Sequence, residues 1–381
     1  GPMQTKKKKK KRRSNATPSP QHGETAFTND YERPRLDVFN QHCDSVIEKY
    51  GLDQLHQQGI VTEIEPTDGD VKVVVSMPND AEDIVYTAQN VVLALGNDEP
   101  SYADWVDEED IEKGLVHHLL DDRKSAEGCR NPKHASVAHS VAVIGGGITA
   151  AHKVLELLRE KEESGHPSTT IHLISRNPLR EQQFDTHQDW MMDRAASKRS
   201  EEAGGSGTPK CQRKFSECSC MKERRMIIGK ERIPGTVTRA VNRGENGLRY
   251  AIENGDIQFH NAEILNKRYI NDDDNPQECE LDLSCGTTIE VNQILLATGF
   301  GKKPPGGSLI QNDLIKKAGL EVSEFCGFPI VDDDLRWHSR IFVAGALAEL
   351  ELGPSARNIA GARLAAERIV QASSTAQNIH R

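Results

Sequence analysis

The first third of the chain alternates between helical and strand-like patterns of apolar residues. Within Leu36–Tyr50, apolar side chains stand at positions 36, 38, 39, 46 and 47, a spacing that predicts an amphipathic helix. Short runs typical of strands follow at residues 59–66, 71–77, 82–88 and 90–97. Asp68-Gly69 suits a hairpin turn between the first two, and the last run ends at Gly96.

The middle of the chain changes to a strand–helix–strand pattern at residue 139. The segments "SVAVIG", "ITAAHKVLELLREK" and "TTIHLISR" form a βαβ unit, which implies a parallel sheet covered by helices. Polar, acidic residues at 98–138 precede this unit and are expected to connect two domains. Residues 196–224 are charged and rich in Gly and Ser, and we expect a long mobile insertion there.

Two similar apolar strands flank the βαβ unit. "VVLALG" (91–96) precedes it and "ILLATG" (294–299) follows it, and each ends at a turn of small residues. This pairing indicates that the chain leaves one domain, builds a second and returns to the first. Further strands are expected at 279–283, 288–300 and 340–348, and "ARNIAGARLAAERIVQA" predicts a C-terminal amphipathic helix.

Charge is distributed very unevenly along the chain. The net charge is −10, although Lys6–Arg13 supplies eight consecutive positive charges, so the remaining chain is more acidic still. An acidic body repels nucleic acid and anionic membranes, which leaves the basic tail as the one place where nucleic acid could bind. Residues 1–30 are therefore expected to form a disordered basic tail, either a solvated arm or a nuclear-targeting or polyanion-binding segment.

Composition limits the location and the metal chemistry. No apolar run approaches the roughly 20 residues that cross a bilayer, so no membrane partner is expected. The eight cysteines contain no C-x-x-C pair, which predicts free thiols in a reducing compartment and no metal site. We expect a cytoplasmic protein, and the basic tail leaves a nuclear location open.

The glycine-rich turn of the βαβ unit carries the clearest chemistry. "GGGITA" (145–150) has the pattern G-x-G-x-x-A, in which Gly145 permits a tight turn and Gly147 lets a pyrophosphate approach the backbone. Ala150 allows close packing of the helix, whose first residues, Ile148 and Thr149, offer free N–H groups to phosphate. The turn predicts dinucleotide binding; the alternative is a glycine-rich turn without a ligand.

The end of the second strand indicates which dinucleotide is bound. In the NAD-binding version an acidic residue stands there, whereas this strand ends in Ser175-Arg176, and Arg180 follows. Guanidinium groups suit a 2′-phosphate, so NADPH is predicted in preference to NADH. The alternative is that both arginines are ordinary surface charges.

These motifs together resemble those of flavoprotein oxidoreductases in which an NADPH domain is inserted into an FAD domain. Within that superfamily the chain resembles the N-hydroxylating lysine/ornithine-type monooxygenases and their uncharacterised FAD/NAD(P)-binding relatives. "VLALGN" (92–97) and "LLATGF" (295–300) match their two strand-end motifs, "SRNPLREQQFD" (175–185) matches the NADPH-side loop, and residues 341–369 match the last strand, glycine turn and C-terminal helix.

The resemblance implies a fold, a reaction and a second set of site residues. The fold would be α/β, with a Rossmann-like NADPH domain (101–286) inserted into an FAD-type domain (31–100 and 287–381). NADPH would reduce FAD, which would then react with oxygen and a small-molecule substrate, and no catalytic side chain is identified. The positions carried over for FAD are Gly96, Gly299, Gly345, Gly353, Pro354, Asn358 and Gly361. A homo-oligomer is left open.

The chain departs from the family pattern in two places. Ala346 follows Gly345 where many relatives carry Asp, and residues 1–58 contain no G-x-G-x-x-G unit for the ADP half of FAD. Three explanations are open: a shortened form of a complete enzyme, a natural short form that binds NADPH without flavin as a binding or regulatory protein, or a second chain that covers the gap. FAD binding therefore stays open, whereas NADPH is predicted throughout.

Overall fold

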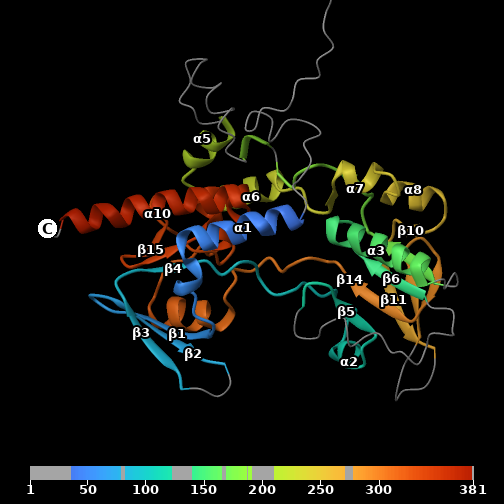
Figure 1. The fold of residues 1–381 in the computed structure, drawn as a ribbon, viewed down its shortest axis with the longest axis horizontal. Helices are drawn as coiled ribbons and strands as arrows, with labels where there is room; N and C mark the ends of the chain where they lie inside the picture. Colours follow the sequence, from blue (N-terminus) through green and yellow to red (C-terminus); the bar gives the residue numbers. More distant parts are fainter. Residues whose placement is uncertain are drawn as a thin grey trace, which may run out of the picture.

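The computed structural model describes residues 36–78, 82–121, 140–164, 169–186, 188–190, 210–270 and 278–379. Two groups of strands lie at opposite ends of the longest axis, and two extended segments run between them (Figure 1). The basic tail lies outside the described residues. Among those that are described, no helix has both the length and the apolar character needed to cross a bilayer.

The first group of strands begins with an antiparallel meander. β1 (Ile60–Pro66), β2 (Val71–Ser76) and β3 (Ile84–Ala88) pair in the order β1-β2-β3. The Thr67 N–H donates to the Asp70 carbonyl at 2.9 Å, and the Thr67 hydroxyl donates to the Asp70 carboxylate at 2.7 Å. These bonds close the turn around Asp68-Gly69, so the predicted hairpin is confirmed.

A second small sheet packs beside the meander. β15 (Arg336–His338), β16 (Ile341–Val343) and β4 (Val91–Leu93) pair in that order, and β4 runs parallel to β16. One hydrophobic cluster joins the two sheets to α10 and the π-helical segment η5. The other helical segments of this group are α1 and η1. The bounds are α1 (Leu36–Tyr50), η1 (Leu52–Leu55), η5 (Leu309–Lys317) and α10 (Ile359–Ile379).

The second group is built on a parallel sheet of five strands in the order β10-β7-β6-β14-β5. Every neighbouring pair in it is parallel, and α3 (Ile148–Ser164) crosses from β6 to β7. The predicted α/β class and Rossmann-like sheet are therefore confirmed. The strands are β10 (Gln258–His260), β7 (Thr170–Ile174), β6 (Ser140–Ile144), β14 (Gln293–Leu296) and β5 (Val116–His118).

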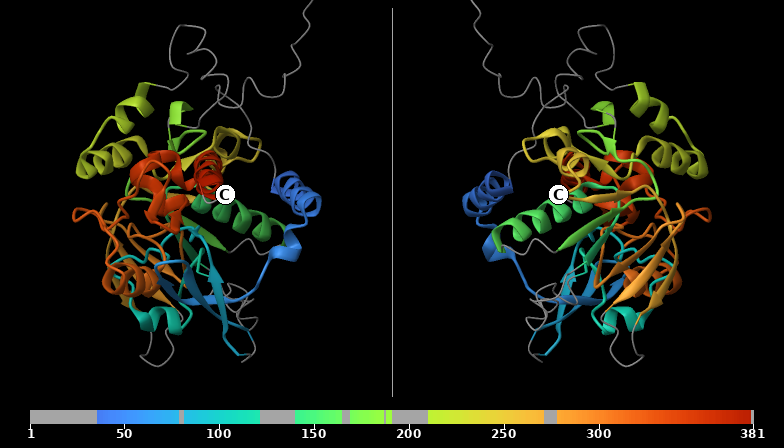
Figure 2. Two further views of the ribbon diagram at one scale, coloured as in Figure 1. Left: turned by 90° about the vertical axis from the view of Figure 1, so that its left-hand side faces the viewer. Right: turned by 90° about the vertical axis from the view of Figure 1, so that its right-hand side faces the viewer.

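Separate hydrophobic clusters lie on the two sides of this sheet. On one side, strands of the sheet share a cluster with an antiparallel meander of β11 (Ile264–Tyr269), β12 (Cys279–Leu283) and β13 (Thr288–Val291). On the other side, α3 packs with α7 (Arg239–Arg243) and α8 (Leu248–Glu253). α2 (Glu108–Glu112) lies next to β5 (Figures 1 and 2).

Three sequence expectations differ from the structure. The boundary predicted at residue 287 assigned residues 293–296 to the FAD-type part. In the structure these residues form β14, which lies inside the central parallel sheet. The predicted connection at 98–138 contains β5, whose three residues are too few to show a strand pattern. Within the predicted insertion, residues 196–209 lie outside the described part, but α5 (Lys210–Ser216) and α6 (Met221–Glu231) are helices.

The remaining elements of the described chain are short. They are β8 (Arg180–Glu181), β9 (Thr236–Val237), η4 (Gln188–Trp190), η6 (Gly345–Ala348), α9 (Glu349–Leu352) and η7 (Pro354–Arg357). Phe215 of α5 and Ile228 of α6 are buried against Trp190 and Phe328 in a separate cluster. This cluster explains why a strongly charged stretch of sequence forms helices here.

Candidate functional site

The glycine turn after β6 is fixed to the ends of two neighbouring strands. Gly145 has φ of 149°, and its N–H donates to the Ile174 carbonyl at 2.9 Å. A Cβ at Gly145 would lie 2.5 Å from the carbonyl oxygen of Ala297, directly after β14. Both the backbone angle and the lack of space therefore require glycine at this position.

Gly147 is different, because neither strain nor crowding within the protein requires glycine there. Its φ is not in the left-handed region, and the nearest atom to an added Cβ would be the Cα of Gly235 at 3.5 Å, an ordinary contact. Gly146, by comparison, would place a Cβ only 2.4 Å from Oγ of Ser175. The open approach to Gly147, at the start of α3, therefore fits a phosphate group that contacts the backbone.

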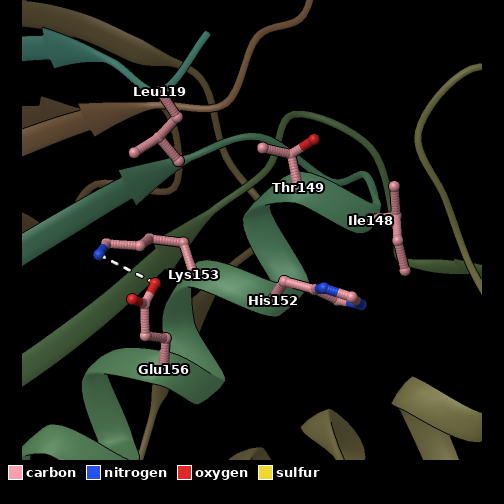
Figure 3. Close-up of a pocket in the computed structure, with 6 residues that line it drawn as sticks. All are labelled: Leu119, Ile148, Thr149, His152, Lys153 and Glu156. Atoms are coloured by element: carbon pink, nitrogen blue, oxygen red, sulfur yellow. Dashed lines mark hydrogen bonds and ion pairs between the residues drawn. The ribbon is translucent and has the colours of Figure 1, made fainter. Parts of the chain in front are cut away.

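The first turns of α3 follow this glycine turn. Ala150 is fully buried between the helix and the sheet, as close packing requires. Ile148 and Thr149 line a hollow of about 440 Å³ together with Leu119, His152, Lys153 and Glu156 (Figure 3). Lys153 and Glu156 are paired at 3.0 Å on its rim. The hollow thus lies along the flank of α3, next to the predicted dinucleotide turn.

The end of β7 places one serine inside the protein and two arginines outside it. Ser175 is buried, and its hydroxyl donates to the Asn177 carbonyl at 2.8 Å. Arg176 and Arg180 are exposed, and within the described part of the chain neither forms an ion pair. Their guanidinium groups remain available to an anion, as the NADPH prediction requires.

Gly96 and Gly299 lie in the two segments that join the halves of the molecule. Both have positive φ, 72° and 77°, and Ser101 N–H donates to the Gly299 carbonyl at 2.8 Å. Pro100 and Phe300 form an antiparallel bridge, so the outgoing and returning segments lie side by side (Figure 1). The segments that follow the two paired motifs therefore lie side by side, whereas their strands, β4 and β14, belong to different sheets.

The C-terminal positions predicted for FAD lie around α9 and η7. Gly345 and Gly353 both have positive φ, Pro354 is buried, and the Asn358 side-chain oxygen accepts from the Gly361 N–H at 3.2 Å at the start of α10. A Cβ at Gly353 would lie 2.7 Å from the ring of Trp190. Trp190 therefore covers this turn, a contact that the sequence did not indicate.

A cluster of arginines surrounds one buried carboxylate next to this turn. Glu349 is 1% exposed, and its side chain pairs with Arg225 of α6, with Arg357 at 2.7 Å and with Arg232 at 3.9 Å. Burial is the main cause that lowers the pKa of all three guanidinium groups, and repulsion from Arg357 adds to it for Arg225 and Arg232. We call Arg225, Arg232 and Arg357 the arginine triad.

Neither the arginine triad nor Trp190 was predicted from the sequence. Arg225 and Glu349 are 124 residues apart, and α6 begins inside the segment that was predicted to be a mobile insertion. The only signal in the sequence was "KERRMIIGKERIPG", a basic run of helical length that ends in Pro-Gly. Such a run is also typical of a solvated helix, so it did not identify the cluster.

The comparisons with known proteins agree with this architecture. The profile of the family L-lysine 6-monooxygenase/L-ornithine 5-monooxygenase matches residues 26–189, which include α1, the first meander and the glycine turn. The predicted resemblance to the lysine/ornithine-type monooxygenases is thus confirmed, and the solved structures described next show the fold that this chain shares with them. No curated protein matches the chain significantly.

Solved structures show the same fold at low sequence identity. Ornithine hydroxylase PvdA from Pseudomonas aeruginosa aligns with a TM-score of 0.60 and 17% identity over 89% of this chain and 75% of that one. Ornithine N-hydroxylase KtzI from Kutzneria sp. 744 aligns with a TM-score of 0.61 and 18% identity over 92% of this chain and 85% of that one. Cadaverine monooxygenase DfoA from Erwinia amylovora aligns with a TM-score of 0.61 and 16% identity over 88% of this chain and 72% of that one.

Proposed function

We propose that this protein is an NADPH- and FAD-dependent monooxygenase that hydroxylates a nitrogen atom of a small amine. The observation that carries the proposal is the family match over residues 26–189, because this range includes both the glycine turn and the basic end of β7. The match favours this function over the flavin-free alternative.

The described residues fit NADPH. The open backbone at Gly147 and the first N–H groups of α3 would hold the diphosphate. Arg176 and Arg180, exposed beyond β7, would pair with the 2′-phosphate. NADPH bound there would supply the reducing equivalents of the reaction.

The described residues fit only the flavin half of FAD. Gly345, Gly353, Pro354 and Asn358 lie together at the start of α10, where the resemblance expects the flavin ring. The described part of the chain contains no second glycine-rich βαβ unit, and β4 is an edge strand on which Val92 is 48% exposed. Bound FAD would supply the oxygen-activating chemistry, and this chain would contribute the walls that exclude water from it.

The substrate class is proposed from the similar structures. Their names mention ornithine, lysine and cadaverine, and all three molecules end in a primary amine. We therefore propose a small aliphatic amine as substrate, with oxygen added to its terminal nitrogen.

The flavin spectrum of the purified protein tests the proposal. We expect a yellow protein that bleaches when NADPH is added without oxygen, and that forms a hydroxylamine from L-ornithine, L-lysine or cadaverine with oxygen present. A colourless protein that binds NADPH but takes up no added FAD would contradict the proposal and support the flavin-free alternative.

The arginines at the end of β7 provide a separate test of the cofactor. Replacing Arg176 and Arg180 with Ala removes the partners proposed for the 2′-phosphate, so the Kd for NADPH should rise roughly 10- to 100-fold. The Kd for NADH, which lacks that phosphate, should not change. Equal losses for both nucleotides, measured by titration calorimetry, would show that these arginines do not recognise the 2′-phosphate.

A further inference from the structure

The arginine triad has more positive charge than its partner neutralises. Three guanidinium groups share the single carboxylate of Glu349: Arg225 pairs with Oε1, whereas Arg357 and Arg232 both face Oε2. Asp185 and Asp98 favour the charged forms of Arg232 and Arg357 from a distance, but within the described part neither forms an ion pair with the triad. Partly buried cations in such excess are costly without a further anion.

The triad is also accessible at one member. Side-chain exposure is 33% for Arg232, 21% for Arg225 and 11% for Arg357. Arg232 lies 3.9 Å from Glu349, too far for a normal hydrogen bond, so its guanidinium has donors to spare. Arg225 and Arg357 are held in place because both guanidinium groups lie over the ring of Phe328, at 4.6 and 5.9 Å from its centre.

The position of the triad connects it to both halves of the candidate site. Arg232 begins the segment Arg232-Ile233-Pro234-Gly235, and Gly235 lies against the glycine turn at Gly147. Three residues span at most about 11 Å, so Arg232 lies close to the predicted diphosphate site. Arg357 ends η7, directly after the turn at Gly353. The triad therefore stands between the dinucleotide turn and the start of α10.

We propose that Arg225, Arg232 and Arg357 form a binding site for a carboxylate or phosphate group of a molecule held between the two halves. Planar guanidinium groups bind both oxyanions through paired, charge-assisted hydrogen bonds. Two sources could supply the oxyanion: the diphosphate of the dinucleotide, or the α-carboxylate of an amino-acid substrate such as ornithine. Cadaverine has no carboxylate and therefore distinguishes the two. The choice of source rests on the proposed function, whereas the anion site itself does not.

Arg232→Met tests the site, because Arg232 is the member least coupled to Glu349. Binding of pyrophosphate, NADPH, NADH, L-ornithine and cadaverine is measured by titration calorimetry on the full chain. We expect the variant to lose roughly 10- to 100-fold in affinity for pyrophosphate and for one class of natural ligand. Arg249→Met, which removes an exposed arginine paired with Glu253 on α8, is the matched control and should leave every affinity unchanged.

The pattern of loss identifies the source of the anion. Equal losses for NADPH and NADH would assign the site to the dinucleotide diphosphate, and a loss for L-ornithine but not for cadaverine would assign it to a substrate carboxylate. Unchanged affinities for all five ligands would overturn the proposal and leave the triad as an ion-pair network only. If Arg232→Met fails to fold, Arg232→Lys gives the same readout, since it keeps the charge and loses the paired geometry.

Pyrophosphate separates this proposal from the proposed function. A colourless protein that binds pyrophosphate through Arg232 would reject the monooxygenase and keep the anion site. A yellow, NADPH-oxidising protein with no response to Arg232→Met would keep the monooxygenase and reject the site.

Discussion

At the scale of single residues, the glycine turn separates structural from ligand-binding roles. Gly145 is required by its φ of 149° and by the carbonyl of Ala297, whereas Gly147 has room for a side chain within the protein. The sequence pattern predicted a tight turn at Gly145 and the approach of a pyrophosphate at Gly147. The distances support this division, because only Gly145 is crowded by atoms of the protein itself.

Two alanine variants make this distinction measurable. Gly145→Ala should lower the free energy of unfolding by about 2–4 kcal/mol, because the new methyl group meets backbone atoms. Gly147→Ala should change it by less than about 1 kcal/mol and still weaken NADPH binding at least roughly tenfold. Urea denaturation and NADPH titration measure both effects, and equal stability losses for the two variants would contradict this assignment.

A buried histidine pair in the central sheet makes stability depend on pH. His172 is 5% exposed, its Nδ1 lies 3.1 Å from Nε2 of His260, and burial followed by repulsion from His260 lowers the pKa of His172 to about 4. The folded state therefore holds His172 neutral at pH values where the unfolded state already binds a proton.

Because the folded state binds this proton more weakly than the unfolded state, acid should lower the stability of the protein. As pH falls from about 6.5 toward 4, the unfolded chain binds more protons, so the free energy of unfolding should fall by about 2–3 kcal/mol. His172→Leu should flatten this dependence, and His56→Asn, at an exposed position, should not. Urea denaturation at pH 7 and pH 5 measures it; the same slope in His172→Leu and wild type would refute this origin.

At the scale of elements, α6 and α9 are held together by charge. Arg225 reaches Glu349 and Arg224 reaches Glu351, while Trp190 packs between the same elements and donates to Glu231 at 3.3 Å. α6 has little apolar pattern of its own, so its place in the fold depends on these partners. This explains why the sequence indicated a loop where the structure has helices.

Removing the central carboxylate should therefore be costly. Glu349→Gln leaves three partly buried guanidinium groups without their shared anion, and we expect a loss of about 3–5 kcal/mol in the free energy of unfolding. Glu367→Gln, which removes an exposed partner of Arg363 on α10, should cost less than about 1 kcal/mol. Guanidinium denaturation compares the two, and similar small losses would show that Glu349 is not a central support.

At the scale of the whole molecule, two adjacent segments connect the halves. Leu120 N–H donates to Nδ1 of His118, so Nε2 carries the proton and donates to the Thr298 hydroxyl at 3.1 Å. That hydroxyl in turn donates to the Ser101 carbonyl at 2.5 Å. The relay joins β5 to both connecting segments, so it fixes the returning segment against the outgoing one.

Thr298→Val removes the hydroxyl and keeps the shape of the side chain. We expect the free energy of unfolding to fall by about 1–2 kcal/mol, since one bond is lost on each side of the hydroxyl. Thr288→Val, on the exposed edge of the β11–β13 meander, is a control that removes one hydroxyl bond to Asp282. Calorimetric unfolding measures both, and a Thr298→Val curve identical to wild type would show that the relay adds no stability.

Elements that depend on residues close together in the sequence could be predicted, whereas elements that depend on distant residues could not. The helix at 36–50, the hairpin around Asp68-Gly69 and the βαβ unit were predicted correctly, because each depends on residues that are close in the sequence. β5 was missed because three buried residues carry no period, and the domain boundary was misplaced because β14 pairs with strands far away in the sequence.

The sequence by itself determined the glycine turn, the acid-free end of β7 and the departure and return of the chain, since strand, turn and helix patterns are local. The tertiary structure decided which glycines the fold requires, that Trp190 covers Gly353, and that three arginines from distant segments converge on Glu349. The physical reason is burial: packing from distant segments creates the excess charge and the shortage of space, and no local pattern records either.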